Sequence, residues 1–78
     1  MFRQELFGKR LWELRTARGE KQPALAELLG LSVPQVSEME RGKKGTTLEK
    51  LALICAHYQV SADYLLGLTD DPAPFHRK

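Results

Sequence analysis

The thiol of Cys55 and the imidazole of His57 are functional groups that catalysis and metal binding often use. They stand two residues apart in a stretch of helical periodicity, and residues with that spacing point to different faces of a helix. A second histidine, His76, has no partner fixed by spacing. The sequence contains no metal-ligand cluster, glycine-rich phosphate loop or nucleophile elbow. We therefore expect a protein that is not an enzyme and that uses no cofactor and no metal.

With catalysis and metal binding disfavoured, the sequence can be examined for electrostatic binding of a charged partner. Basic side chains are concentrated in the first part of the chain. Residues 1–50 contain ten Lys and Arg against seven Asp and Glu, a balance of +3, whereas residues 51–78 have two against three, a balance of −1. A polyanion would meet the first part more favourably. The basic stretch of Arg41, Lys43 and Lys44 is expected to contact phosphate groups, and Lys9, Arg10 and Lys50 are interpreted as solvated charges.

The size and composition of the chain restrict its class. Seventy-eight residues fit one domain with a small core. Cys55 is the only cysteine, which excludes a disulfide within the chain and favours a buried structural thiol. The apolar stretches are too short and too often interrupted by charges to span a bilayer, and no signal peptide is visible. We expect a cytoplasmic protein without a membrane contact and without an evident small-molecule ligand.

Apolar periodicity and helix-end signals predict an all-α domain over residues 1–68. The expected helices cover residues 3–18, 22–29, 33–41, 47–58 and 62–66. Residues 69–78 are expected to form a flexible tail, in which Phe75 could anchor on a partner subunit. The third helix has the clearest start signal, because Ser32 and Gln35 have the spacing of a capping box.

The fourth helix has two candidate N-caps, Thr46 and Thr47, and Glu49 has the spacing of a capping box from Thr46. Its apolar stripe is expected to consist of Leu48, Leu51, Ala52, Cys55 and Tyr58. In the first helix, Trp12 lies off the apolar stripe and is expected to be partly exposed.

Residues 22–42 have the features of two short helices joined by a tight turn. Ala26 provides a small side chain where the two backbones approach, and Gly30 accepts the positive φ that the turn requires. The apolar residues that can face inward from the two helices are Leu25, Leu29, Leu31, Val36 and Met39. This combination at this spacing is typical of a helix-turn-helix.

From about Phe7 to Gly67, the chain resembles the Cro and phage-repressor (XRE-type) helix-turn-helix family. The resemblance rests on five blocks in order, RLWELRTARG, Gln22 with ALAELLGLS, VSEMERGK, TLEKLALICAHYQVS and DYLLG. It implies a five-helix, lambda-repressor-like domain whose third helix docks in the major groove of double-stranded DNA, usually as a homodimer on a palindromic site. The function that it implies is that of a small transcriptional regulator, which we expect to act as a repressor.

The resemblance also assigns roles to single residues. A basic residue matching Arg15 pairs with a glutamate matching Glu40, and such a pair would tie the first helix to the third. The positions implied to contact bases are Ser32, Val33, Pro34 and Glu38, and those implied to contact phosphates are Gln22, Arg41, Lys43 and Lys44. Helical geometry turns Ser37 outward as well, which adds it to the candidates for base contact.

The expected reading face departs from the family pattern. Val33 and Pro34 stand where polar side chains are common, and they offer only apolar contact, for instance with a thymine methyl. Glu38 can accept from a cytosine amino group, and its charge repels phosphates. Gln35, occupied in its capping box, is interpreted as unavailable to bases. Two accounts remain open, specificity from a few contacts plus DNA shape, or a domain whose DNA binding has weakened.

Two further interpretations concern protein partners. The same fold could serve as a protein-interaction module, an antirepressor or an assembly partner, instead of a DNA reader. A homodimer interface is expected at Tyr64, Leu65, Leu66 and Leu68, which are more apolar surface than one short helix readily buries. The fifth helix could equally close the core against the first.

Overall fold

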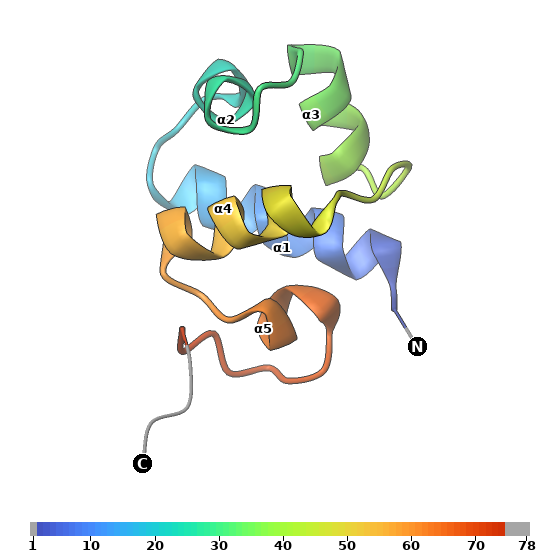
Figure 1. Ribbon diagram of the computed structural model, residues 1–78, viewed down its shortest axis with the longest axis vertical. Coiled ribbons are helices and arrows are strands. Elements are labelled where there is room, and N and C mark those ends of the chain that lie inside the picture. Colours follow the sequence, from blue (N-terminus) through green and yellow to red (C-terminus); the bar gives the residue numbers. More distant parts are fainter. Residues whose placement is uncertain (1, 75–78) are drawn as a thin grey trace.

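Five α-helices follow one another in the computed structural model, which describes residues 2–74 (Figure 1). They are α1 (Gln4–Ala17), α2 (Gln22–Leu29), α3 (Val33–Glu40), α4 (Leu48–Tyr58) and α5 (Ala62–Leu66). The expected all-α class is confirmed, and each helix end lies within one residue of its expected position. Arg3, Arg18, Arg41 and Thr47 were expected inside helices but are the flanking cap residues. Phe75 and His76 lie outside the described residues.

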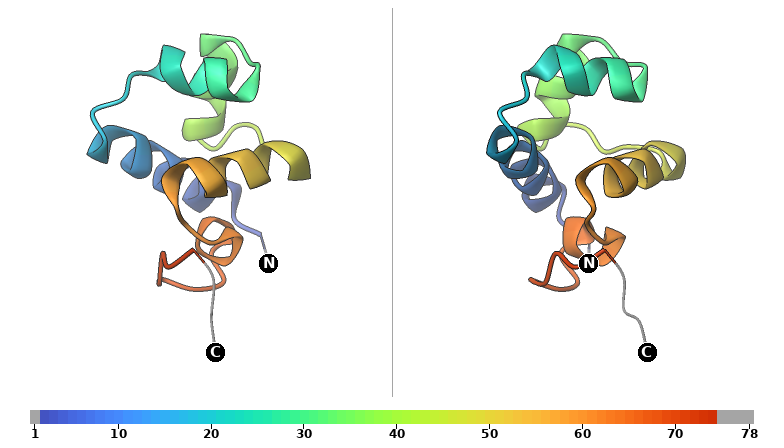
Figure 2. Two further views of the ribbon diagram at one scale, coloured as in Figure 1. Left: turned by 60° about the vertical axis from the view of Figure 1, so that its left-hand side comes forward. Right: turned by 90° about the vertical axis from the view of Figure 1, so that its left-hand side faces the viewer.

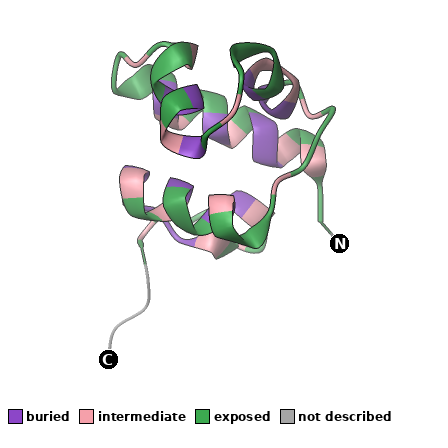
Figure 3. Cartoon of the chain, turned by 45° about the horizontal axis from the view of Figure 1, so that its top comes forward, coloured by how far each residue is buried: buried purple, intermediate pink, exposed green. Residues whose placement is uncertain are grey.

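The helices surround one core to which every helix contributes. α1 and α4 occupy the middle of the molecule, α2 and α3 lie at one end and α5 at the other (Figures 1 and 2). The largest fully buried side chains are Phe7 and Leu11 of α1, Leu25 of α2, Val36 of α3, Ile54 of α4 and Leu65 of α5. Figure 3 shows the same division, with buried positions on the inner sides of the helices. Leu65 is completely buried, so its expected place in a dimer interface is wrong.

The helix-turn-helix is set by backbone conformation and capping. Gly30 ends α2 with φ of 67°, in the left-handed region that glycine adopts without a steric penalty. Ser32 begins α3 with both halves of a capping box, because its side chain accepts from the Gln35 N–H and its own N–H donates to the Gln35 side chain. The chain therefore enters α3 at a fixed angle to α2.

α1 passes α3 at very close range. A Cβ atom added at Gly8 would lie 2.3 Å from the carbonyl oxygen of Met39 and 2.7 Å from that of Glu40. Both oxygens belong to backbone and cannot move aside cheaply, so any larger residue at position 8 would push the helices apart. Glycine at this position allows the last turn of α3 to rest directly on α1.

α4 differs from its expected form at its start and along its apolar face. Thr47 is the N-cap and accepts from the Lys50 N–H at 3.1 Å, while the Thr46 hydroxyl oxygen is buried and has no hydrogen-bond partner. The expected capping box between Thr46 and Glu49 is therefore wrong. The buried stripe consists of Leu51, Ile54 and Tyr58, whereas Leu48 is 85% exposed. Leu48 and Ala52, expected to face the core, are turned outward.

A polar cluster around Glu20 fastens the α1–α2 loop to the end of α4. The Tyr58 hydroxyl donates to Glu20 Oε1 at 2.7 Å, and His57 Nε2 lies 2.8 Å from Glu20 Oε2. Burial opposes ionisation of Glu20, but the contacts with Tyr58, His57 and Arg18 outweigh it and hold the pKa of Glu20 below its ordinary value. Burial and the bond to Glu20 raise the pKa of Tyr58, so its hydroxyl remains a donor.

Residues 69–72, expected as part of a flexible tail, contact the helices. Arg10 of α1 donates to the carbonyl oxygens of Tyr64 and of Thr69 and pairs with Asp70 at 2.6 Å. Its guanidinium also stacks over the Tyr64 ring, 4.2 Å from the centroid. The Ser61 N–H donates to the carbonyl oxygen of Pro72 at 3.3 Å. Arg10, interpreted from the sequence as a solvated charge, therefore holds the segment that follows α5.

The lowered pKa of Glu20 makes one contribution to stability dependent on pH. A carboxylate whose folded pKa is depressed stabilises the protein above its unfolded pKa, near 4.5 here, and loses that contribution as the pH falls through the folded pKa. Glu20→Gln should therefore lose less free energy of unfolding between about pH 6 and pH 3 than the parent chain. Urea unfolding at several pH values measures this difference, and parallel curves for the two proteins would show that Glu20 makes no such contribution.

Candidate nucleic-acid interface

A buried ion pair holds α3 on the rest of the domain. Arg15 Nε donates to Glu40 Oε2 at 2.6 Å and Arg15 Nη2 donates to Glu40 Oε1 at 3.0 Å, a two-point contact. The two side chains are only 8% and 3% exposed. The hydrogen bond to Glu40 outweighs burial and raises the pKa of Arg15. The pair that the family resemblance implied is therefore present, and it is structural.

The same two side chains also form hydrogen bonds with α2 and with the loop before it. Arg15 Nη1 donates to the carbonyl oxygen of Glu20 at 2.7 Å, and Gln22 Nε2 donates to Glu40 Oε1 at 3.0 Å. One carboxylate at the last residue of α3 thus accepts from α1 and from α2. Gln22, expected at a phosphate, already uses one of its two amide N–H groups within the protein.

The N-terminal turn of α3 faces solvent. Ser32, Val33 and Pro34 are exposed, and Val33 is 38% exposed. Ser37 and Glu38, one turn further along the helix, are half-buried. The Ser32 hydroxyl is committed to the capping box, where it contacts Gln35 Oε1 at 3.1 Å. The side chains left free on this turn are therefore the apolar Val33 and Pro34.

The capping box also fixes which end of the Gln35 amide faces outward. Gln35 Oε1 accepts from the Ser32 N–H at 2.8 Å, and only the oxygen can do so. The Nε2 group consequently points away from Ser32 and has no partner among the described residues. Sequence analysis treated Gln35 as unavailable, whereas the structure leaves it a donor of fixed orientation.

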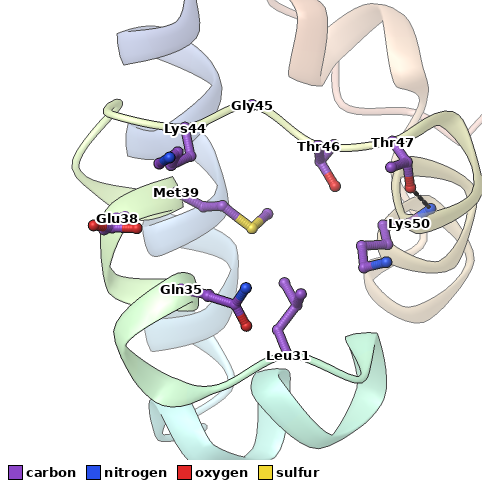
Figure 4. Close-up of a pocket in the computed structure, with 9 residues that line it drawn as sticks. All are labelled: Leu31, Gln35, Glu38, Met39, Lys44, Gly45, Thr46, Thr47 and Lys50. Carbon is purple, nitrogen blue, oxygen red and sulfur yellow. Dashed lines mark hydrogen bonds between the residues drawn. The ribbon is translucent and has the colours of Figure 1, made fainter.

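A groove of about 380 Å³ separates α3 from the start of α4 (Figure 4). The residues that line it are Leu31, Gln35, Glu38, Met39, Lys44, Gly45, Thr46, Thr47 and Lys50. Two lysines against one glutamate give the lining a net positive charge. Figure 4 shows the Gln35 amide and the Lys50 side chain on facing sides of the groove. Lys50 was interpreted from the sequence as a solvated charge, and nothing in the spacing of residues 35 and 50 predicts that they share a surface.

The basic residues after α3 are available to a ligand. Arg41, Lys43 and Lys44 are exposed, and within residues 2–74 none of them forms an ion pair. Gly42, between them, has φ of 78° and packs on Glu5 of α1, which fixes where the basic loop leaves the helix. A free cationic loop thus stands directly beside the exposed end of the groove.

Other kinds of site were examined in the same part of the chain. Residues 2–74 contain no group of three or more His, Cys, Asp or Glu side chains that could hold a metal ion. Burial raises the pKa of the Cys55 thiol, which disfavours the nucleophilic thiolate. Within the same range, no helix has the length and apolar character that crossing a membrane would require.

Comparison with known protein families and sequences identifies relatives. A helix-turn-helix domain family matches residues 6–68. An uncharacterised HTH-type transcriptional regulator of Bacillus subtilis, YobD, is 39% identical over 69 residues, which are 88% of this chain and 62% of that protein. The HTH-type transcriptional regulator PrpR of Mycobacterium tuberculosis is 36% identical over 63 residues, 81% of this chain and 13% of that protein. The chain thus spans less than two thirds of these relatives.

Comparison with solved structures confirms the lambda-repressor-like, five-helix fold. The restriction-modification controller protein C.AhdI of Aeromonas hydrophila superposes with a TM-score of 0.69 at 35% identity, covering 80% of this chain and 94% of that one. The P22 c2 repressor, solved with a synthetic operator, superposes with a TM-score of 0.71 at 32% identity, covering 77% and 91%.

The buried pair predicts an asymmetry between single and double substitution. Arg15→Met leaves the Glu40 carboxylate buried without its cation, and should lower the free energy of unfolding by roughly 3–5 kcal/mol. Arg15→Met combined with Glu40→Leu removes both charges and should recover most of that loss. Urea denaturation followed by circular dichroism measures both variants. A double variant as unstable as the single one would contradict the assignment of the cost to an unpaired buried charge.

Proposed function

The chain belongs to the helix-turn-helix domain family, and on this premise we propose that it binds double-stranded DNA sequence-specifically as a small transcriptional regulator with the role of a repressor. The observation that carries the proposal is the exposed first turn of α3, held rigidly by the capping box and the Arg15–Glu40 pair beside a cationic loop without ion pairs. α3 enters the major groove with this turn first. The P22 c2 repressor, 32% identical to this chain, was solved with a synthetic operator, which supports DNA as the partner.

Base reading in this proposal is mostly apolar. Val33 and Pro34 contact thymine methyl groups, which are the apolar feature of the major groove. Glu38 accepts from a cytosine amino group, the base-edge donor that a carboxylate suits. Ser37 completes the set with a short hydroxyl contact, and Ser32, whose hydroxyl hydrogen is committed to Gln35, accepts with its second lone pair. Sequence-dependent DNA shape supplies the remaining specificity, because so few polar groups reach the bases.

Phosphate binding is proposed on both sides of α3. Arg41, Lys43 and Lys44 contact one strand from the loop, and Gln22 uses its second amide N–H at the start of α2. A phosphate of the backbone also sits in the groove between α3 and α4, where Gln35 Nε2, Lys44 and Lys50 converge. The exposed N–H groups at the start of α4 add the positive end of a helix dipole.

Two copies are proposed to act together. Small helix-turn-helix domains read few base pairs, and a two-fold dimer doubles the contact on a palindromic site. The alternative function, a protein-interaction module, is favoured by the apolar Val33 and Pro34 on the exposed face. It differs from DNA binding in its response to salt, because counterion release makes the affinity for DNA fall steeply as salt rises.

The loop cations should govern the salt dependence of binding. Arg41→Ala with Lys43→Ala should weaken binding to every sequence and lower the slope of log K against log salt by about two. Lys9→Ala removes one exposed charge from α1 and none from the loop, and it should leave the slope unchanged. Fluorescence anisotropy with labelled duplexes at several salt concentrations measures this. Absence of duplex binding by the parent chain at low salt, with binding to a protein instead, would reject the proposed function.

Substitutions at Gln35 and Glu38 should distinguish a contact with the DNA phosphates from a contact with the bases. Gln35→Glu keeps the oxygen that accepts from the Ser32 N–H, so the fold should be preserved, but it replaces the amide donor with a negative charge. Binding should weaken by about tenfold on all sequences. Glu38→Gln should instead change the preferred base at one position. Binding of a panel of duplexes with single base-pair changes tests both; full affinity for Gln35→Glu would remove the phosphate from the groove.

A further inference from the structure

α4 carries two apolar stripes, and only one of them faces the core. Leu51, Ile54 and Tyr58 are buried against the other helices. Leu48 and Ala52 are exposed on the other side of α4, and half-buried Cys55 lies in line with them at the edge of the core. The spacing along this outer stripe is 4 and 3 residues, the repeat by which one helix packs along another. An apolar helix face with this repeat is typical of a surface that is covered.

The outer stripe has a protruding end and a hollowed end. Leu48, at the start of α4, is 85% exposed. Further along, the small side chains of Ala52, Cys55 and Ala56 line a hollow of about 560 Å³, whose lining also includes Leu48, Val60 and Pro74. None of the residues that line this hollow is charged, and depletion of charge is the feature that distinguishes the centre of protein interfaces.

The surface expected from the sequence for dimerisation is less available. Leu65 belongs to the core, the guanidinium of Arg10 covers the Tyr64 ring, and residues 69–72 fold back along α5. Leu68 remains exposed, but it follows α5 and does not belong to it. The fifth helix therefore presents no continuous apolar face, whereas α4 does.

We propose that the outer stripe of α4 is the homodimer interface, with a second copy of this chain packed antiparallel to it. Leu48 of each copy then enters the hollow at Cys55 and Ala56 of the other, so the same contact is made twice. A two-fold interface requires this kind of self-complementary surface. Antiparallel pairing also brings the positive N-terminal end of one α4 beside the negative C-terminal end of the other.

The inference rests on the proposed function in its requirement for two copies, and it adds where they meet. The small side chains at the centre of the stripe allow the two helix backbones to approach closely. With Leu48 opposite Ala56 of the second copy, the two Ala52 positions lie beside each other near the two-fold axis. A two-fold axis through α4 also relates the two α3 helices, as a palindromic site requires.

Sedimentation equilibrium of the full chain without DNA tests the interface. The parent chain should dimerise, and Leu48→Lys should weaken dimerisation by more than about tenfold, because it places a charge in the apolar hollow. Leu53→Lys is the matched control, since Leu53 is also exposed on α4 but lies off the stripe, and it should dimerise normally. Thermal melts of both variants verify that each is folded. Equal dimerisation of the two variants, or a parent chain that stays monomeric at millimolar concentration, would overturn the proposal.

Cross-linking tests the antiparallel register. Ala52→Cys in a Cys55→Ser background should form an interchain disulfide on mild oxidation, whereas Leu53→Cys in the same background should not.

If instead the parent is monomeric and deletion of residues 75–78 makes it dimeric, the chain's own C-terminus occupies the hollow and the proposal is wrong. Titration of a single half-site duplex separates the two proposals, since Ala56→Glu, which places a charge in the hollow two turns from the start of α4, should prevent dimerisation but bind this duplex as the parent does. If neither the variant nor the parent binds this duplex while the parent still dimerises, the DNA-binding proposal is wrong and the interface proposal is retained.

Discussion

The buried contact between Arg15 and Glu40 is the interaction on which the rest of the structure depends. A charge pair taken out of water is expensive unless its geometry is good and its remaining hydrogen-bonding groups are satisfied. Here both conditions are met, with two bonds inside the pair, a third to the Glu20 carbonyl and a fourth from Gln22. Three segments therefore converge on one carboxylate, and α3 has a fixed orientation relative to α1 and α2. The close approach at Gly8 acts in the same place and leaves no room for a larger side chain.

This rigid mounting fits a recognition element whose own chemistry is sparse. The exposed turn of α3 presents Val33 and Pro34, so in this proposal phosphate contacts position the helix and DNA shape supplies much of the selectivity. The capping box contributes twice, because it starts the helix and orients the Gln35 amide with its donor outward. Lys44, Lys50 and the loop cations then surround α3 with positive charge. The proposed DNA-contacting surface thus has a weakly polar centre at Val33 and Pro34 and cationic side chains around it.

Local signals were predictable from the sequence, and contacts between distant segments were not. Helix ends at Gly30 and Ser32 follow from φ preference and capping, which involve neighbouring residues, and the Arg15–Glu40 pair was implied only through family resemblance. The phase of α4 was predicted wrongly because apolar residues occupy most of its faces: Leu48 and Ala52 were expected in the core-facing stripe, where Ile54 lies instead. The cluster of Glu20 with His57 and Tyr58 joins residues 37 and 38 positions apart, so no local pattern announces it. Arg10 was interpreted wrongly for the same reason, because its partners Tyr64 and Asp70 lie 54 and 60 positions away.

The central claim is that this chain reads DNA with the exposed turn of α3, as a pair of copies. Selection of bound duplexes from a random pool at low salt tests it most directly. The account predicts enrichment of a palindromic motif whose half-sites are separated by about one helical turn, roughly 10 base pairs, with thymine and cytosine at the positions that face Val33, Pro34 and Glu38. A pool that shows no enrichment, while the folded protein is present in excess, would contradict it.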